Sequence, residues 1–97
     1  MFAEKLKELR ENRQLLQRQV SAKLEIDNAL YCKFESGSRI PRREQVIQLA
    51  DLYNYDQEEL LKLWLADKVY DLVGEEDNKD EVLNFVAENI TEYERRK

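Results

Sequence analysis

The stretch QRQVSAKLEIDNALYCKFESGSR, at residues 17–39, decides the fold of this chain. Val20 and Leu24 are four residues apart, which predicts one buried stripe on a helix over about 17–24. A second helix is expected over about 28–35, and Ile26 is expected to fill the space beneath the connection. Two short helices joined by a tight turn form a helix-turn-helix motif.

The ends of the second helix carry recognisable signals. Asp27 is suited to the N-cap position, because its short carboxylate can accept the free amides of the first turn. Gly37 is suited to end the helix, because glycine adopts positive φ without strain. In a helix-turn-helix the second helix enters the major groove of DNA, so residues 28–35 are the candidate recognition helix.

The apolar spacing of the remaining chain is helical as well. A helix ending near Asn12 is predicted by Phe2, Leu6 and Leu9. Pro41 suits the first turn of a helix whose buried side is Val46, Ile47, Leu49, Ala50 and Tyr53. Asp56 and Glu59 have the capping-box spacing at the start of the next helix. We therefore expect an all-α fold.

The last predicted helices carry more apolar surface than one domain can cover. The helix after Asp56 is apolar on two sides, which calls for two burial partners. Residues 74–79 are acidic and polar, so we place the boundary there: a DNA-binding domain at 1–73, and at 74–97 a linker with a sixth helix. That helix packs either on its own subunit or on a second one. The candidate dimer interface is Leu61, Leu65, Val69, Leu72, Val82, Phe85, Val86 and Ile90.

Composition and charge limit the classes of function. Of 97 residues, 38% are charged, and there are two glycines, one proline and one cysteine. The net charge is −5, but residues 1–50 hold ten basic and seven acidic residues, whereas residues 51–97 hold six and fourteen. The basic half is suited to phosphates, and the acidic half should point away from them. The alternative explanation is that the charges lie on solvated surfaces and that their uneven distribution is due to chance.

Several classes are disfavoured. The chain has no histidine, the commonest general base, so we expect no enzyme. Nor does the pattern indicate a metal site, a cofactor or a small-molecule ligand. No apolar run reaches the roughly 18–20 residues of a membrane span, and charged residues interrupt the N-terminal segment where a signal peptide would be apolar. A single cysteine cannot form a disulfide within the chain, so a reducing cytoplasm is the expected compartment.

Residues 2–60 resemble the lambda-repressor-like, XRE-type helix-turn-helix regulators. The positions that carry the resemblance are Leu6, Leu9, Arg10, Leu15, Gln17, Val20, Leu24, Ile26, Phe34-Glu35-Ser36-Gly37, Pro41, Leu49-Ala50 and Leu60. The resemblance implies five helices in the DNA-binding domain and an ion pair between Arg10 and Glu35. The helix after Asp56 also resembles small restriction-modification controllers. Leu16, Glu25 and Tyr31 depart from the family pattern, which has a polar cap, a glycine and a smaller residue there.

The same resemblance assigns the DNA contacts. The base-contacting residues would be Asn28, Ala29, Leu30, Cys32 and Lys33. Gln17 would bind a phosphate at a helix N-terminus. The other candidates for the DNA backbone are Arg18, Lys23, Ser38, Arg39, Arg42 and Arg43. Cys32 is weighed both as a small side chain beside DNA and as a redox sensor.

The expected function is sequence-specific binding of double-stranded DNA. We expect a homodimer that represses transcription from a palindromic operator, because a two-fold axis places two recognition helices about one DNA turn apart. The competing hypothesis is a protein-interaction or antitoxin-type module that kept the fold and lost DNA binding. The acidic second half, Leu16 and Glu25 favour that alternative.

Overall fold

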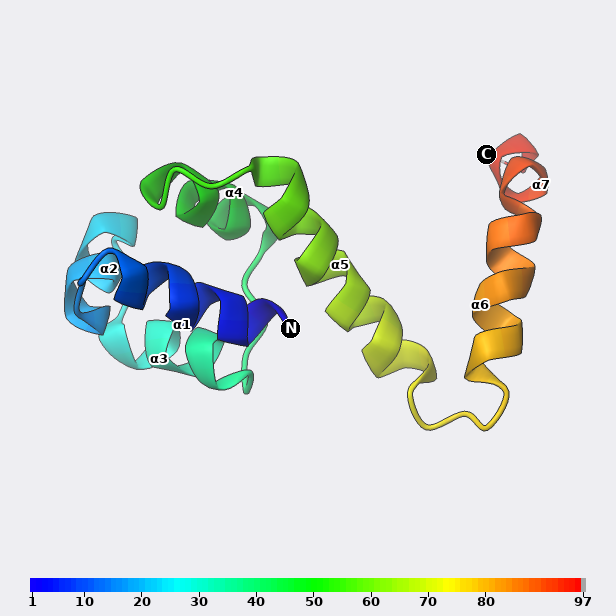
Figure 1. Cartoon of the computed structure of the whole chain (residues 1–97), viewed down its shortest axis with the longest axis horizontal. Helices are drawn as coiled ribbons and strands as arrows, with labels where there is room; N and C mark the ends of the chain where they lie inside the picture. The colour runs from blue at the N-terminus through cyan, green and yellow to red at the C-terminus, as the bar shows by residue number, and fades with distance from the viewer. Residues whose placement is uncertain (97) are drawn as a thin grey trace. The chain divides into compact units, whose positions relative to one another are not determined.

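The computed structural model describes residues 1–96 and contains seven α-helices in that range (Figure 1). In chain order they are α1 (Phe2–Asn12), α2 (Gln17–Leu24), α3 (Asn28–Ser36), α4 (Arg43–Leu52), α5 (Gln57–Val73), α6 (Lys79–Glu88) and α7 (Ile90–Arg95). The all-α prediction is confirmed. The chain forms two compact units, Met1–Asp67 and the part that begins at Lys68.

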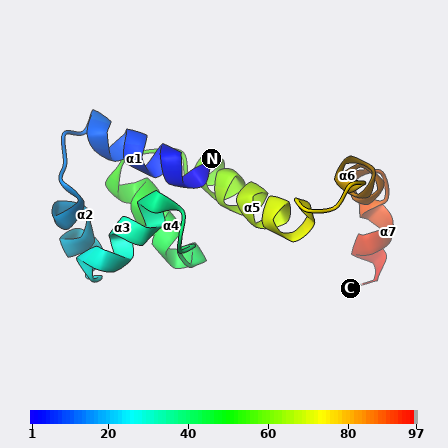
Figure 2. The same ribbon diagram turned by 90° about the horizontal axis from the view of Figure 1, so that it is seen from below.

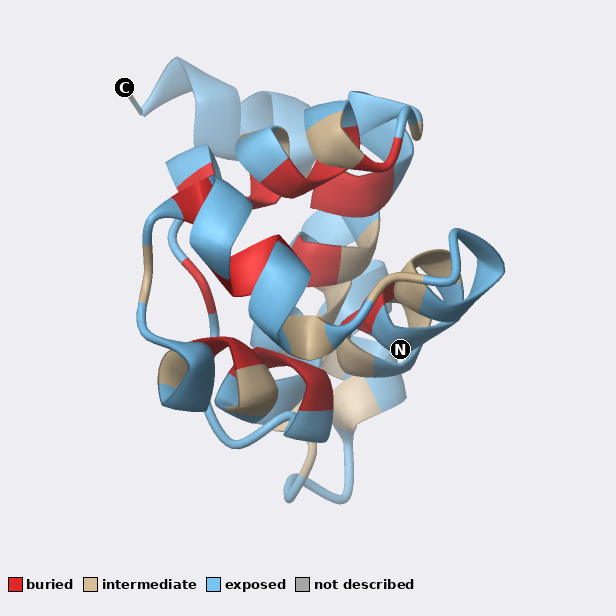
Figure 3. Ribbon diagram, turned by 90° about the vertical axis from the view of Figure 1, so that its left-hand side faces the viewer, coloured by how far each residue is buried: buried red, intermediate tan, exposed pale blue. Residues whose placement is uncertain are grey.

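The first unit holds the hydrophobic core. In it α3 packs against both α1 and α2, and α2 also contacts α4; Figure 2 shows these helices from below. The ribbon segments coloured as buried lie where the helices of this unit face one another (Figure 3). They are Phe2, Leu6, Val20, Leu24, Tyr31, Phe34, Val46, Leu49, Ala50, Tyr53, Leu60, Leu61 and Trp64.

The tight turn between α2 and α3 contains a strained residue. Glu25 ends α2 in the left-handed region, at φ 57° and ψ 42°. The Ile26 amide then donates to the Ser21 carbonyl over 3.0 Å, which closes the turn. Positive φ explains why the family pattern has a glycine at the position of Glu25. Gly37 likewise ends α3 at φ 82°, as predicted.

Of two expectations about helix starts, the one for Asp27 is confirmed in position only, and the one for Pro41 is wrong. Asp27 occupies the N-cap position of α3, but its side chain makes no capping hydrogen bond. Pro41 does not lie in the first turn of α4, which begins two residues later at Arg43. Pro41 is instead buried, and its carbonyl accepts a 2.8 Å hydrogen bond from Nε1 of Trp64. That contact holds the α3–α4 connection against α5.

Asp56 caps the start of α5, as predicted. A second carboxylate, within α5, caps the start of α1. Oδ1 of Asp56 accepts from the amides of Glu58 and Glu59, at 2.9 and 3.4 Å. Further along α5, Oδ2 of Asp67 accepts from the Phe2 amide over 3.0 Å. This carboxylate therefore satisfies a free N–H at the start of α1, where the helix dipole also favours negative charge.

The second unit differs from the single sixth helix that we expected. Asn89 separates α6 from α7 at φ −112° and ψ 20°, and its Nδ2 donates to the Phe85 carbonyl over 2.8 Å. Neither α6 nor α7 contains a buried residue. The boundary between the units lies inside α5, before the acidic break at residues 74–79. The reason is that the last core side chain of α5 is Trp64.

Leu61 is a correction to the predicted dimer interface. Its side chain is only 9% exposed and belongs to the core of the first unit. Leu65, Val69 and Leu72 of the same helix are exposed. None of the helices described is long and apolar enough to cross a membrane.

Candidate nucleic-acid interface

Helix α3 has one side that packs into the core and another that faces outward. Tyr31 and Phe34 are buried, and their rings meet edge to face with centroids 6.2 Å apart. The five predicted base-contacting residues of α3 lie on or near the surface. Asn28, Ala29 and Lys33 are exposed, and Leu30 and Cys32 are half-buried. Leu30 also packs against the core, so only part of its side chain faces outward.

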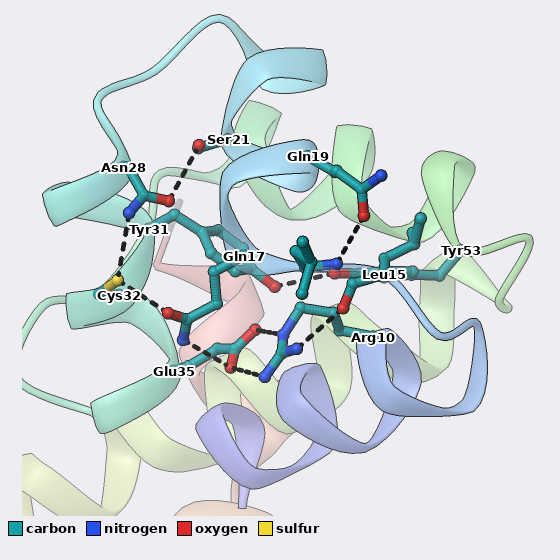
Figure 4. Close-up of polar contacts among 11 residues, drawn as sticks. Arg10, Leu15, Gln17, Gln19, Ser21, Asn28, Tyr31, Cys32, Glu35 and Tyr53 are labelled. Carbon is teal, nitrogen blue, oxygen red and sulfur yellow. Dashed lines mark hydrogen bonds and ion pairs between the residues drawn. The ribbon is translucent and has the colours of Figure 1, made fainter.

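An ion pair between Arg10 and Glu35 joins α1 to the last turn of α3 (Figure 4). Nε of Arg10 lies 2.7 Å from Oε2 of Glu35, and Nη2 lies 3.0 Å from Oε1. The third contact of the guanidinium is the Leu15 carbonyl, at 2.9 Å from Nη1. The two parallel bonds fix both planes, which is a geometry that lysine could not reproduce.

The surroundings of Glu35 keep its carboxylate ionised. Burial by itself raises the pKa of Glu35, but hydrogen bonds from Arg10, Tyr31 and Gln17 outweigh burial. The pKa therefore lies below its ordinary value of 4.5. On the other side of the pair, the bond to Glu35 raises the pKa of Arg10 despite partial burial. Both groups are thus charged at neutral pH.

Gln17 contacts this ion pair from the first residue of α2. Its Nε2 donates to Oε1 of Glu35 over 3.1 Å, and its Oε1 accepts from Sγ of Cys32 at 3.0 Å (Figure 4). Both ends of the amide are therefore used within the protein. The Gln17 backbone N–H at the start of α2 is the group suited to a phosphate.

Asn28, at the start of α3, lies between two neighbours. Its Oδ1 accepts from Oγ of Ser21 over 3.2 Å, and its Nδ2 donates to Sγ of Cys32 over 3.8 Å (Figure 4). Ser21 was not among the predicted site residues. One signal was available, because Ser21 lies one turn after Gln17 and so shares its side of α2.

The basic side chains near α3 are exposed. Arg39 and Arg42 lie in the loop after Gly37, and Arg43 begins α4. The guanidinium carbon of Arg43 lies 5.4 Å from the centroid of the Trp64 ring, so this side chain also stacks on the core. Arg18, Lys23 and Ser38 are exposed too. Within residues 1–96, no group of three or more acidic or cysteine side chains is arranged to hold a metal ion.

These features define a helix-turn-helix domain, and comparison with known proteins agrees. The family model described as "Helix-turn-helix domain" matches residues 3–65, so the chain belongs to this family, of the XRE type. Over its whole length the chain is 31% identical to an uncharacterized HTH-type transcriptional regulator, YqaE, of Bacillus subtilis, and the match covers 97% of that protein. No solved structure matches the chain significantly.

Proposed function

We propose that this protein is a transcriptional repressor that binds a palindromic operator as a homodimer. The observation that carries the proposal is the outer face of α3, held in place by Tyr31 and Phe34 beneath it and by the Arg10–Glu35 pair at its end. A recognition helix needs such rigid support, because base contacts are lost when it shifts. The name of the Bacillus subtilis relative supports a role in transcription.

The base contacts follow from the chemistry of the exposed side chains. Asn28 can pair with adenine through one donor and one acceptor, and Lys33 can donate to O6 and N7 of guanine. Ala29 and the outer part of Leu30 offer apolar contact to a thymine methyl group. Cys32 is a small, half-buried side chain on the same helix. The redox alternative receives no support, because Cys32 is the only cysteine of the chain.

The DNA backbone contacts would come from both sides of α3. Arg39, Arg42 and Ser38 are exposed beyond its C-terminal end, and Arg18 and Lys23 are exposed on α2. The remaining candidates are Arg43 and the backbone N–H of Gln17. Each neutralised phosphate releases counterions, so these contacts supply affinity without sequence preference.

Dimerisation would use the exposed apolar side chains that follow the core. On α5 they are Leu65, Val69 and Leu72, and on α6 and α7 they are Phe85, Val86 and Ile90, with Val82 half-buried. Exposed large apolar side chains in such number are typical of protein interfaces. A second copy of the chain would bury it, and the two-fold axis would set the spacing of the half-sites. We place such a protein at the nucleoid in the cytoplasm.

Selection from random DNA tests the proposal. We expect the full-length chain to enrich a palindrome whose half-sites lie about one helical turn apart. Asn28→Ala and Lys33→Ala should each change one base preference per half-site, whereas Lys62→Ala, on α5, should change none. Failure to enrich any sequence at moderate salt would contradict the proposal.

The second candidate is a protein-interaction module, and the internal engagement of both ends of the Gln17 amide favours it. Salt dependence separates the two. Binding to DNA should weaken steeply with salt, whereas an apolar protein interface is much less sensitive.

A further inference from the structure

The contacts at the start of α3 form one directed chain of hydrogen bonds. Nδ2 of Asn28 donates to Sγ of Cys32, the thiol donates to Oε1 of Gln17, and Nε2 of Gln17 donates to Oε1 of Glu35 (Figure 4). The last acceptor is the carboxylate held by Arg10. The chain thus connects the most buried charge of this region with an exposed residue that faces outward.

The direction of this chain follows from the charge of Glu35. An ionised carboxylate only accepts hydrogen bonds, so Gln17 must turn its Nε2 toward Glu35 and its Oε1 toward Cys32. The thiol has one proton, which it donates to that oxygen, and its sulfur is left as an acceptor. Asn28 must therefore turn its Nδ2 toward Cys32. Its Oδ1 then faces the Ser21 hydroxyl at 3.2 Å, and that hydroxyl shares its one proton between Asn28 and the Arg18 carbonyl at 3.1 Å. The contact with Cys32 therefore decides the orientation of the Asn28 amide.

We propose that Cys32 is a positioning residue that fixes the amide orientation of Asn28 for base recognition. This inference rests on the proposed function. Asn28 keeps one N–H and one oxygen lone pair after its contacts with Cys32 and Ser21, which is the pair of groups that an adenine edge requires. An amide turned by 180° would exchange donor and acceptor, and would no longer match that edge. A fixed orientation is therefore a source of specificity.

Two properties make Cys32 suited to this role. It lies one helical turn after Asn28 on α3, so the two side chains share a face. It is also half-buried, so its contact with Gln17 is partly shielded from water. Alanine or valine at this position would leave the Gln17 oxygen and the Asn28 amide without this partner. Serine would keep one donor and two acceptor lone pairs.

The first arm of the test needs no DNA. In the free full-length protein, nuclear Overhauser contacts should join the Asn28 side-chain amide protons to the Cys32 β-protons, and coupling constants should report one χ1 rotamer. In Cys32→Val the rotamer should become averaged, and Cys32→Ser should restore it. An Asn28 side chain equally ordered in Cys32→Val would overturn the proposal. Cys32→Ala serves as the same test if the valine variant does not fold.

The second arm measures discrimination on the selected operator. Asn28→Ala identifies the base pair that Asn28 contacts. At that base pair alone, we expect Cys32→Val to reduce discrimination by about tenfold and Cys32→Ser to recover most of it. Equal loss at every base pair would indicate a merely structural role and would overturn the proposal. Absence of any operator would refute the proposed function, while the first arm would still decide whether Cys32 orders Asn28.

Discussion

The hydroxyls of Tyr31 and Tyr53 lie 2.8 Å apart and form a hydrogen bond inside the core. Both side chains are almost fully buried, and they join α3 to the residue that ends α4. Burial raises the pKa of each hydroxyl, so both remain neutral. Tyr31 departs from the family pattern, which has a smaller residue there. Its hydroxyl finds a partner in Tyr53, the residue that follows α4.

This pairing predicts a non-additive effect on stability. Tyr31→Phe leaves the hydroxyl of Tyr53 buried without this partner and also removes the hydrogen bond from Tyr31 to Glu35, so it should cost about 1–3 kcal/mol. Tyr53→Phe should cost less, because the Tyr31 hydroxyl keeps Glu35 as a partner. The double variant removes both hydroxyls and should cost less than the two single changes together. Urea unfolding of the four proteins measures the coupling. Strictly additive losses would show that the bond adds no coupling energy.

The Glu35 carboxylate predicts how stability depends on pH. Its pKa in the folded protein lies below 4.5, because hydrogen bonds outweigh burial. A lowered pKa contributes stability that is fully present above the unfolded value and is lost as the pH falls through the folded value. The free energy of unfolding should therefore decline below about pH 4.5. Urea unfolding at a series of pH values measures the decline.

Two variants assign that decline to Glu35. Glu35→Gln should lower stability at neutral pH by about 3 kcal/mol, because it leaves the partly buried Arg10 unpaired. It should also flatten the acid decline. Glu44→Gln removes an exposed carboxylate of α4 and should preserve the slope. The same acid slope in Glu35→Gln as in the parent protein would contradict the assignment.

The exposed arginines predict the salt dependence of DNA binding. Arg39→Gln and Arg42→Gln should each reduce the slope of log affinity against log salt by about 0.9, because each would remove one of the proposed phosphate contacts. The base preferences of the operator should stay the same. The matched control is Lys7→Gln, which removes an exposed charge from α1. The measurement is a binding titration at several salt concentrations, and an unchanged slope would remove these arginines from the interface.

Local signals predicted much of the fold, whereas spacing along the chain predicted no contact between distant residues. The Arg10–Glu35 ion pair was expected only from the family resemblance. The spacing of Val20 and Leu24 and the glycine at Gly37 placed α2 and the end of α3 correctly, because these signals act within one turn of helix. The bond from the Phe2 amide to Asp67 joins residues 65 positions apart. No rule of residue spacing predicts such a partner.

In the candidate site, too, some features were predicted and contacts between helices were not. The outward face of α3 was expected from the family resemblance, and Ala29 and Lys33 are exposed on it. The engagement of Gln17 by Glu35 and Cys32 did not follow, because it depends on how α2 and α3 cross. For the same reason Leu61 could not be distinguished from Leu65 by its apolar character. Only packing shows that the former lies in the core.

The exposed apolar side chains beyond the core predict how the proposed dimer responds to new charges. Leu72 of α5 is 83% exposed and Phe85 of α6 is 59% exposed, so neither is held by the core of its own chain. Leu72→Asp and Phe85→Asp should therefore weaken self-association without lowering the stability of the first unit. Sedimentation equilibrium of the full-length chain measures this. Asn84→Asp adds the same charge at another exposed position of α6 and serves as the control.

The strained turn between α2 and α3 predicts a stabilising substitution. Glu25 has φ 57°, a conformation that costs a residue with a β-carbon about 1–2 kcal/mol. Glu25→Gly removes that cost, although glycine makes the unfolded chain more flexible by about 0.4–1 kcal/mol. We expect a net gain of up to about 1 kcal/mol, measured by thermal unfolding.

The control for this substitution is Glu25→Ala, which removes the same charge but keeps the β-carbon and hence the strain. Alanine should bring little gain. If alanine and glycine stabilised the protein equally, loss of the Glu25 carboxylate would be the cause, and the backbone conformation would carry no cost. If glycine alone stabilises it, the turn tolerates a strained residue that the fold does not need. The operator affinity of Glu25→Gly would then show whether this strain serves the placement of α3.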